Sequence, residues 1–384
     1  MSGTHNRNGI WWRHYIPILL VVFVLLAPFS RDYFNEQGVR WLYIVFLSFS
    51  LSFCLTPIAR WTAYRLFALD IPDRRKNHAE ATPLLGGAAI FTAFILAIVI
   101  NGIYSPELAA ILLAAALLFV VGIIDDVREI PAKIKLVVQL ICVGIVLFHG
   151  VVLRVMPAHY GVLADILNYA LTLLWITGIT NALNFFDGMD GMASGLGVII
   201  SFFLGVVAFQ SDQPFLGWVA AAMLGSCLGF IPYNLLKRGR ATIFLGDAGS
   251  TVIGFVLSCV AVYGDWNPGN HFSAIAAPIL IFWILIFDMV HITVDRIISG
   301  RVHNFREWID YVGHDHLHHR ISAVLGGQKR SVFFIYLLSV CFGCSAVALR
   351  NATTLDAIVL LIQAIFLVAL VTVLERSARS SKNC

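Results

Sequence analysis

Residues 108–126 read LAAILLAAALLFVVGIIDD, an uncharged apolar run that ends in the adjacent carboxylates of Asp125 and Asp126. A run of this kind can span most of a bilayer, because a helix of about 20 apolar residues matches the hydrocarbon core. Adjacent carboxylates at a membrane face are costly unless a cation or a proton relieves them. The stretch therefore predicts a membrane helix with an ionic site at one end.

The composition of the whole chain agrees with this stretch. Of the 384 residues, 59% are hydrophobic and 12% are charged, and the mean hydropathy is +0.84. A soluble domain carries roughly 25% charged residues, and the apolar runs lack the alternation of a membrane β-barrel. Backbone groups in lipid must be hydrogen-bonded within the protein, so we predict an all-α polytopic membrane protein with residues 1–384 as a single integral domain.

Twelve apolar segments are candidate transmembrane helices. The first, which follows Arg7 and Arg13, could be read as a signal peptide, but no A-x-A-like cleavage site follows and we expect a retained helix. The segments are residues 14–29, 41–60, 84–103, 108–124, 135–154, 164–183, 193–210, 214–232, 247–264, 272–293, 331–349 and 353–374.

The basic residues predict the orientation of these helices. Twelve spans put both termini on one side, and that side receives nearly all of the 26 Lys and Arg residues. Only Arg31, Arg40, Arg154 and Arg350 fall on the other side. The positive-inside rule makes the rich side cytoplasmic, so both termini are expected in the cytoplasm. The net charge of +4 then reflects topology and affinity for phosphate, and we expect no nucleic-acid partner.

Five polar clusters interrupt the apolar chain, and all five fall on the predicted cytoplasmic side. In the first, Arg74, Lys76 and His78 offer donors to phosphate oxygens, although the same loop could simply anchor to anionic lipid headgroups. In the second, Lys135 follows the paired aspartates and could pair with them or hold a phosphate. The alternative for the paired aspartates is helix capping.

The third and fourth clusters carry oxygen ligands of the kind that Mg²⁺ prefers. Asn184, Asp187 and Asp190 lie within a short, glycine-rich segment at the end of a span, which could also be an ordinary turn. Asp247 stands where another span begins, so it is either a helix cap or a metal ligand. We favour the metal reading for both clusters.

The fifth cluster is His314-Asp-His-Leu-His-His-Arg320. No cysteine lies nearby and the spacing fits no common zinc site, so His316, His318, His319 and Arg320 are expected to face an anionic group such as a diphosphate. A solvated loop is the alternative. Two acids lie in or just after the preceding span, Asp288 and Asp295. Asp288, within the span, is a functional suspect by its position, although pairing with Arg296 or His291 would account for either.

Taken in order, the five clusters resemble the polyprenyl-phosphate N-acetylhexosamine-1-phosphate transferase family. Within it the chain is most similar to the undecaprenyl-phosphate α-N-acetylglucosaminyl 1-phosphate transferases. The similarity covers roughly residues 42–350, with the active-site loops at residues 64–83, 125–135, 184–192, 233–247 and 294–330. It implies a ten-helix core plus one extra helix at each end, giving 11–12 transmembrane helices.

The resemblance also implies roles for individual residues. Asp125 and Asp126 match the paired aspartates of the family, and Lys135 matches the lysine that follows them and contacts phosphate. Asn184-x-x-Asp187-Gly-x-Asp190-Gly matches a second motif. The implied assignments are catalytic roles for Asp125, Asp126, Asp187 and Asp190, metal ligation by Asn184 and Asp247, and substrate contacts from Arg74, Lys76, His78, Lys135, His316, His318, His319 and Arg320.

The reaction implied by the resemblance moves HexNAc-1-phosphate from a UDP-sugar to a polyprenyl phosphate and releases UMP. The cofactor would be Mg²⁺, with Mn²⁺ as a substitute, at the inner membrane of a bacterium. UDP-GlcNAc and undecaprenyl phosphate are the expected substrates, and the product would start cell-surface polysaccharide such as lipopolysaccharide O-antigen or cell wall. The resemblance leaves open another UDP-deoxysugar donor, a MurNAc-pentapeptide donor, and a homodimer. The competing class is a transporter or channel with an acidic ion path.

Overall fold

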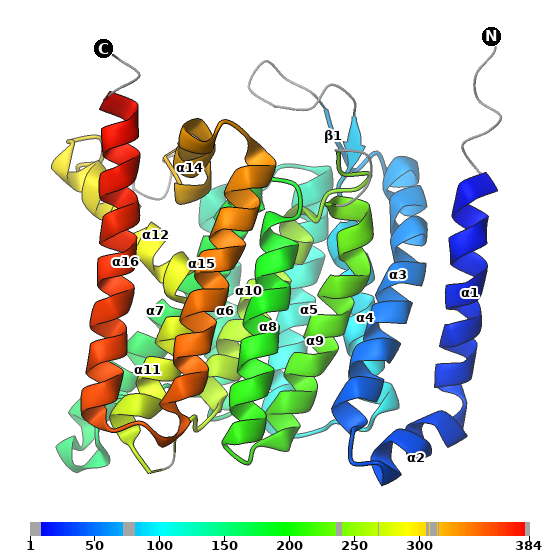
Figure 1. Cartoon of the computed structure of the whole chain (residues 1–384), viewed down its shortest axis with the longest axis horizontal. Coiled ribbons are helices and arrows are strands. Elements are labelled where there is room, and N and C mark those ends of the chain that lie inside the picture. The colour runs from blue at the N-terminus through cyan, green and yellow to red at the C-terminus, as the bar shows by residue number, and fades with distance from the viewer. Residues whose placement is uncertain are drawn as a thin grey trace.

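The computed structural model describes residues 9–71, 81–235, 240–267, 269–304, 307, 313 and 315–380. They form a bundle of helices with a single short strand pair, β1–β2, at one end (Figure 1). The helices are α1 (Gly9–Leu26), α2 (Pro28–Glu36), α3 (Arg40–Leu66), α4 (Gly86–Ile100), α5 (Pro106–Val127), α6 (Ala132–Phe148), α7 (Val162–Phe185), α8 (Met192–Gln210), α9 (Pro214–Asn234), α10 (Gly246–Tyr263), α11 (His271–Ile281), α12 (Trp283–Ile298), α14 (Leu317–Leu325), α15 (Gln328–Ala348) and α16 (Thr354–Ser380). The strands are β1 (Leu69–Asp70) and β2 (Thr82–Pro83), and the 3₁₀ turns are η1 (Ala158–Tyr160), η2 (Phe186–Gly188) and η3 (Leu349–Asn351).

The all-α membrane class is confirmed. Each of the twelve apolar segments is helical, and within the described ranges eight helices are long and apolar enough to cross a membrane. Two bent pairs raise the number to ten. This is fewer than the 11–12 spans expected, because α4 has only 15 residues and α6 only 17.

Two of the expected spans are broken by sharp bends. Helices α1 and α2 meet at 71°, at Pro28, whose ring removes a backbone N–H donor. Helices α11 and α12 meet at 76°, at Phe282. The second bend matters for the site, because α12 carries Asp288 and Arg296.

Helix α10 occupies the centre of the bundle and packs against α5, α7, α4, α8 and α9. Every residue from Ala248 to Val262 is buried. At its first turn the neighbouring helices approach closely because they carry glycine there. A Cβ on Gly122 of α5 would overlap the backbone of Ala248, and one on Gly87 of α4 would overlap Gly249. Small residues allow such close approach between membrane helices, and here they bring three helix ends together.

The polar ends of the helices gather at one end of the bundle. Helix α1 begins and α16 ends at the end that also carries β1 and α14 (Figure 1). The first polar cluster comprises residues 70–87 and the fourth comprises residues 244–250. The described parts of the first cluster contact the fourth cluster at this end of the bundle. Pro83 accepts a hydrogen bond from the N–H of Phe244 at 2.8 Å, and the N–H of Gly86 donates back to the Phe244 carbonyl at 3.0 Å.

Candidate active site

Asp126 holds the first turn of α10. Its Oδ1 accepts a hydrogen bond of 2.8 Å from the backbone N–H of Asp247, and its Oδ2 accepts one of 3.3 Å from Ala248. A carboxylate at a helix N-terminus satisfies unpaired N–H groups and complements the positive end of the helix dipole. Gly246 makes this approach possible, since it adopts a positive φ of 77° and a Cβ there would meet the Asp126 carboxylate. The capping alternative therefore applies to Asp126, which caps a helix distant in sequence.

Lys135 lies between two carboxylates. Its Nζ forms an ion pair with Asp125 and a second, of 2.8 Å, with Asp247. The other oxygen of Asp125 accepts a hydrogen bond of 2.7 Å from the N–H of Ile130, which closes the short connection between α5 and α6. A small pocket opens beside these groups, lined by Leu118, Val121, Gly122, Asp125, Lys135, Gln139, Asp247 and Thr251. The second and fourth clusters thus form one ionic site.

Asn184 links the third cluster to the same site. At the last turn of α7, its Nδ2 donates to Asp247 Oδ1 at 3.2 Å and to the Ser250 hydroxyl at 2.9 Å. Asp187, in the η2 turn, lies close enough for its charge to interact with those of Asp126 and Asp247. The structure therefore brings together Asp125, Asp126, Lys135, Asn184, Asp187 and Asp247.

Asp190 contacts a different part of the site. Its Oδ2 accepts a hydrogen bond of 2.9 Å from the N–H of Ala241, in the segment that leads to Asp247. Asn234, which our sequence analysis missed, supports the same segment. Its buried amide accepts from the N–H of Gly191 at 2.8 Å and donates to the carbonyl of Ile243 at 3.0 Å. Its place at the end of α9, next to a Pro-Tyr pair, gave no sequence signal of this role.

The donor set suits a hard cation. Asp247 and Asp125 offer carboxylate oxygens whose charge Lys135 offsets only in part, and the amide of Asn184 adjoins them, donating from Nδ2 to Asp247 at 3.2 Å. In the described part of the chain no three acid, His or Cys side chains converge as a complete metal cage. Mg²⁺ needs no such cage, since it keeps several waters and binds through one or two carboxylates together with substrate phosphates. The residues present therefore fit Mg²⁺.

The described part of the fifth cluster, residues 315–320, is called the histidine segment. It packs against the third cluster. A Cβ on Gly188 would lie 3.0 Å from Nε2 of His318 and 3.6 Å from Nε2 of His319, so both rings face the Asp187–Gly188 turn. The ring of His316 lies 5.1 Å from that of Phe185, the residue after Asn184. The fifth cluster therefore borders the carboxylate site, across η2.

Helix α12 holds the histidine segment in place. Asp288 is fully buried, and its Oδ2 lies 2.8 Å from Nδ1 of His316. Arg296 forms two hydrogen bonds with Asp315, of 2.8 and 2.7 Å. Burial alone would raise the pKa of Asp315, but the hydrogen bonds and charge of Arg296 lower it below its usual value. The alternative account, in which Asp288 pairs with Arg296 or His291, does not describe its hydrogen bonds, because the histidine segment folds back onto α12 and His316 supplies the partner.

Arg320 extends toward the last helix. Its Nη1 lies 3.2 Å from Nε2 of His291 and 3.6 Å from a carboxylate oxygen of Glu375 in α16. Both Arg320 and Glu375 are buried. The substrate contact expected of Arg320 stays a prediction, and the same holds for the roles of the other site residues. Arg74, Lys76 and His78 lie outside the described residues.

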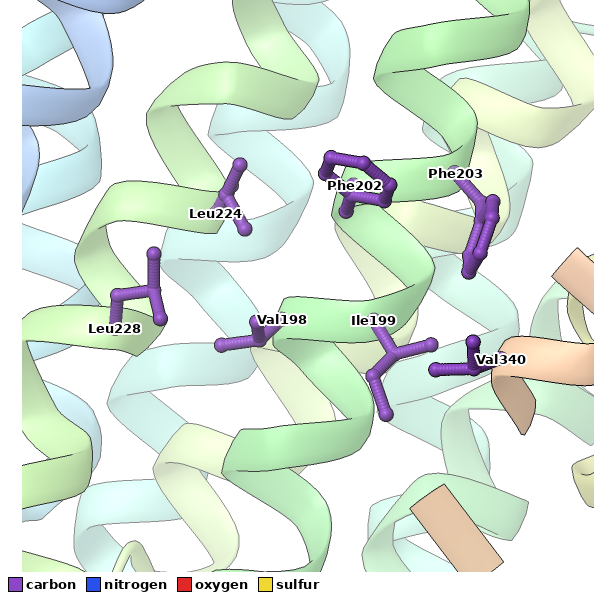
Figure 2. Close-up of a pocket in the computed structure, with 7 residues that line it drawn as sticks. All are labelled: Val198, Ile199, Phe202, Phe203, Leu224, Leu228 and Val340. Carbon is purple, nitrogen blue, oxygen red and sulfur yellow. The ribbon is translucent and has the colours of Figure 1, made fainter. Parts of the chain in front are cut away.

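A second pocket, of about 300 Å³, is apolar throughout. Figure 2 shows its lining: Val198, Ile199, Phe202 and Phe203 from α8, Leu224 and Leu228 from α9, and Val340 from α15. It offers no donor to a phosphate, and its lining shares no residue with the ionic site. Among the pockets of the described residues, the one between Asp125 and Asp247 has the chemistry for an anionic substrate with a cation.

Comparison with known proteins identifies the class. Residues 108–265 match the sequence model of glycosyl transferase family 4. A probable undecaprenyl-phosphate N-acetylglucosaminyl 1-phosphate transferase of Bacillus subtilis is 33% identical over 327 residues, covering 83% of this chain and 87% of the relative. A decaprenyl-phosphate N-acetylglucosaminephosphotransferase of Mycobacterium leprae is 30% identical, covering 88% and 90%. An undecaprenyl-phosphate α-N-acetylglucosaminyl 1-phosphate transferase of Yersinia pestis is 31% identical, covering 78% and 80%.

These similarities extend over most of the bundle and of each relative. The chain belongs to glycosyl transferase family 4, in which it is a polyprenyl-phosphate HexNAc-1-phosphate transferase. It is a multi-pass membrane enzyme. Membership of an enzyme family decides against the transporter alternative.

Proposed function

We propose that this enzyme transfers GlcNAc-1-phosphate from UDP-GlcNAc to undecaprenyl phosphate, releasing UMP and the lipid-diphosphate-linked sugar that starts a cell-surface polysaccharide. The observation that carries the proposal is the convergence of Lys135, Asp126, Asn184 and Asp187 on Asp247, with Asp125 paired to Lys135, at one end of a membrane bundle. The Bacillus subtilis and Yersinia pestis relatives, named for this donor and this lipid, support the same substrates.

The attacking group is the phosphate of the lipid. It displaces UMP at the phosphorus that bears the sugar, so one P–O bond forms as another breaks. Phosphoryl transfer depends on positioning and on stabilising charge. Lys135 can turn from Asp125 and Asp247 to a phosphate oxygen, because its side chain is 32% exposed and lines the pocket. The proposal gives His318 and His319 the role of donors to the diphosphate, and it is supported by the position of both rings against the Gly188 turn.

The proposed cofactor is Mg²⁺, held by Asp247 and Asn184, with Mn²⁺ as a substitute. When bound it supplies positive charge to the diphosphate and to the departing UMP. Asp126 then serves by fixing Asp247, through the hydrogen bonds to the first turn of α10. Asp187 is half-buried on the η2 side, within range of the charges of Asp247, Asp126 and Asp190, and Asp190 orders the segment before Asp247.

The proposed orientation puts the ionic end in the cytoplasm of a bacterium, where the UDP-sugar is dissolved. The Lys and Arg bias of the connections supports it. Cysteines placed singly at Arg240 and at Asp165, at opposite ends of the bundle, would test it. An impermeant maleimide added to whole cells should label only the Asp165 position. Labelling of the Arg240 position alone would show the opposite orientation, with the ionic end outside the cytoplasm.

The test of the reaction is UMP release by the purified chain with undecaprenyl phosphate, UDP-GlcNAc and Mg²⁺. EDTA and Asp247→Ala should each abolish release. Decaprenyl phosphate as acceptor would separate the lipid of the Mycobacterium leprae relative from undecaprenyl phosphate. Release of UMP only from another UDP-HexNAc or from the MurNAc-pentapeptide donor would contradict UDP-GlcNAc as the donor and would still support the transferase reaction.

A further inference from the structure

Asp288 uses both carboxylate oxygens on the histidine segment. Oδ2 lies 2.8 Å from Nδ1 of His316, and Oδ1 accepts a hydrogen bond of 2.7 Å from the backbone N–H of Leu317, the first residue of α14. One side chain therefore fixes both the start of the helix and the ring that precedes it. Burial makes this contact strong, since Asp288 is 0% and His316 7% exposed.

A second contact from the same helix face holds the residue before. Arg296, eight residues after Asp288 and so about two turns along α12, binds Asp315 through two parallel hydrogen bonds. Three consecutive residues, 315 to 317, are thus held by α12. A segment fixed at three successive positions has little freedom to reorient, so the direction of the His316 ring is set by α12.

The other ring nitrogen of His316 has a different environment. In the described part of the chain Nε2 of His316 has no protein hydrogen-bond partner. The ring lies beside Phe185 at 5.1 Å and is stacked with that of His318 at 5.9 Å, on the side of the Asn184–Gly188 segment. With Nδ1 committed to Asp288, the nitrogen that remains for a ligand is Nε2.

We infer that Asp288 is a positioning residue of the transferase: it holds His316 through Nδ1, so that Nε2 is presented to the diphosphate of the nucleotide sugar. The inference rests on the proposed function for the identity of the ligand. Asp288 touches no substrate itself. Its role resembles that of the buried aspartate in a Ser-His-Asp triad. That aspartate holds the histidine ring in place and determines which ring nitrogen faces the reacting groups.

The test compares kcat, KM for UDP-GlcNAc and thermal midpoint in five variants, of which four are single replacements and one is a double replacement. Asp288→Asn, which keeps the shape of the side chain, should lower kcat about 10- to 100-fold, the loss typical when the carboxylate partner of a metal-ligating histidine is removed. It should also raise KM for UDP-GlcNAc, because Nε2 of His316 is no longer held toward the diphosphate. The amide of His316→Asn can still donate to Asp288, but this variant has no atom at the Nε2 position. It should therefore keep the thermal midpoint and lose kcat. Asp295→Asn, a partly exposed acid of the same helix, is the control and should behave as wild type.

The double variant decides whether the two residues act together. His316→Gln can reach the Nε2 position but not Asp288, so Asp288→Asn/His316→Gln should be no slower than the slower single variant. If the factor by which kcat falls in the double variant equals the product of the factors in the two single variants, the residues act independently and the inference is overturned. Wild-type kcat in Asp288→Asn or in His316→Asn, once the amount of folded protein is matched, would also overturn it.

The failure of the proposed function would look different. If the wild type releases no UMP from any UDP-HexNAc, the reaction is wrong, and the same variants are compared by calorimetric binding of UDP with Mg²⁺. Weaker UDP binding in Asp288→Asn that is not additive with His316→Gln would uphold the positioning role alone. Equal UDP affinity in all five variants would overturn it as well.

Discussion

The carboxylate of Asp126, at the end of α5, accepts a hydrogen bond of 2.8 Å from the backbone N–H of Asp247, in the first turn of α10. The contact joins the second and fourth polar clusters and places two acids of the site relative to each other. The close packing of Gly122 on Ala248 makes it possible, since any larger residue at position 122 would separate the two helices.

Replacing Asp126 by Asn should destabilise the protein and reduce its activity. The amide of the variant has one acceptor oxygen, whereas the carboxylate of Asp126 accepts hydrogen bonds with both of its oxygens. Hydrogen bonds to charged groups contribute about 1.5–3 kcal/mol each. Thermal unfolding in detergent and UMP release would measure both effects. Asp165→Asn, an exposed acid at the other end of the bundle, is the control, and a wild-type midpoint in Asp126→Asn would contradict the role of the contact.

Replacing Lys135 by Met should make the site bind divalent cations more tightly in the absence of substrate. It should lower turnover about 100-fold, as the loss of one donor to a developing oxyanion does. The lysine competes with a cation for Asp247, and its loss leaves Asp125 and Asp247 without their shared counter-charge. Stabilisation of the protein by added Mg²⁺ should then occur at lower Mg²⁺ concentration than in wild type. Lys133→Met, an exposed neighbour, should follow wild type. An unchanged Mg²⁺ requirement would show that Lys135 does not share Asp247 with the cation.

The pH dependence of Asp125→Asn tests whether Asp125 is a base. The second pKa of a phosphate monoester is about 6, so the lipid phosphate is already mostly dianionic at neutral pH. Because Asp125 is bound to Lys135 and to the N–H of Ile130, we expect it to position Lys135. Activity of the variant should be reduced by the same factor from pH 6.5 to 9. Recovery toward wild type at high pH would instead identify Asp125 as a general base.

The Asp315 carboxylate should stabilise the fold down to acidic pH. Its pKa in the folded state is lowered: burial opposes this, but Arg296 outweighs burial. The unfolded value is about 3.9, so the stabilisation is fully present above that pH and is lost as pH falls through the lower folded pKa. Asp315→Asn should lower the thermal midpoint at pH 5 to 7 by several degrees. The difference from wild type should shrink only below about pH 4, and a difference that disappears already at pH 5 would contradict the lowered pKa.

Glu375 and Arg320 allow a test of whether Arg320 contacts substrate. Glu375→Gln removes the acidic partner of a buried arginine, which costs about 3–5 kcal/mol when one partner of a buried pair is lost. Glu375→Gln/Arg320→Gln should regain much of that stability. If Arg320 binds the diphosphate, the double variant stays weak in UDP-GlcNAc binding, whereas recovery of both stability and KM would assign Arg320 to the structure alone.

The sequence by itself determined the class and much of the site. Apolar runs such as residues 108–124 have one stable solution in lipid, a hydrogen-bonded helix, so each of the twelve segments is helical. Successive spans cross the membrane in alternating directions, so their order predicts the side on which each polar cluster lies. All five clusters fall on the same side, and this is why their acids, amides and histidines could be predicted to form one site for an anionic substrate.

Only the tertiary structure decided which of these groups meet. Asp126 caps a helix 121 residues away, Asp288 binds His316 and not its neighbours in α12, and Asn234 ties together α8 and the segment before α10. Such partners are set by how closely the helices approach, which depends on glycines at particular crossings, and by the bend at Phe282 that aims α12 at the histidine segment. Hydropathy carries no information about either, because it records how apolar a stretch is and not which face of it meets which neighbour.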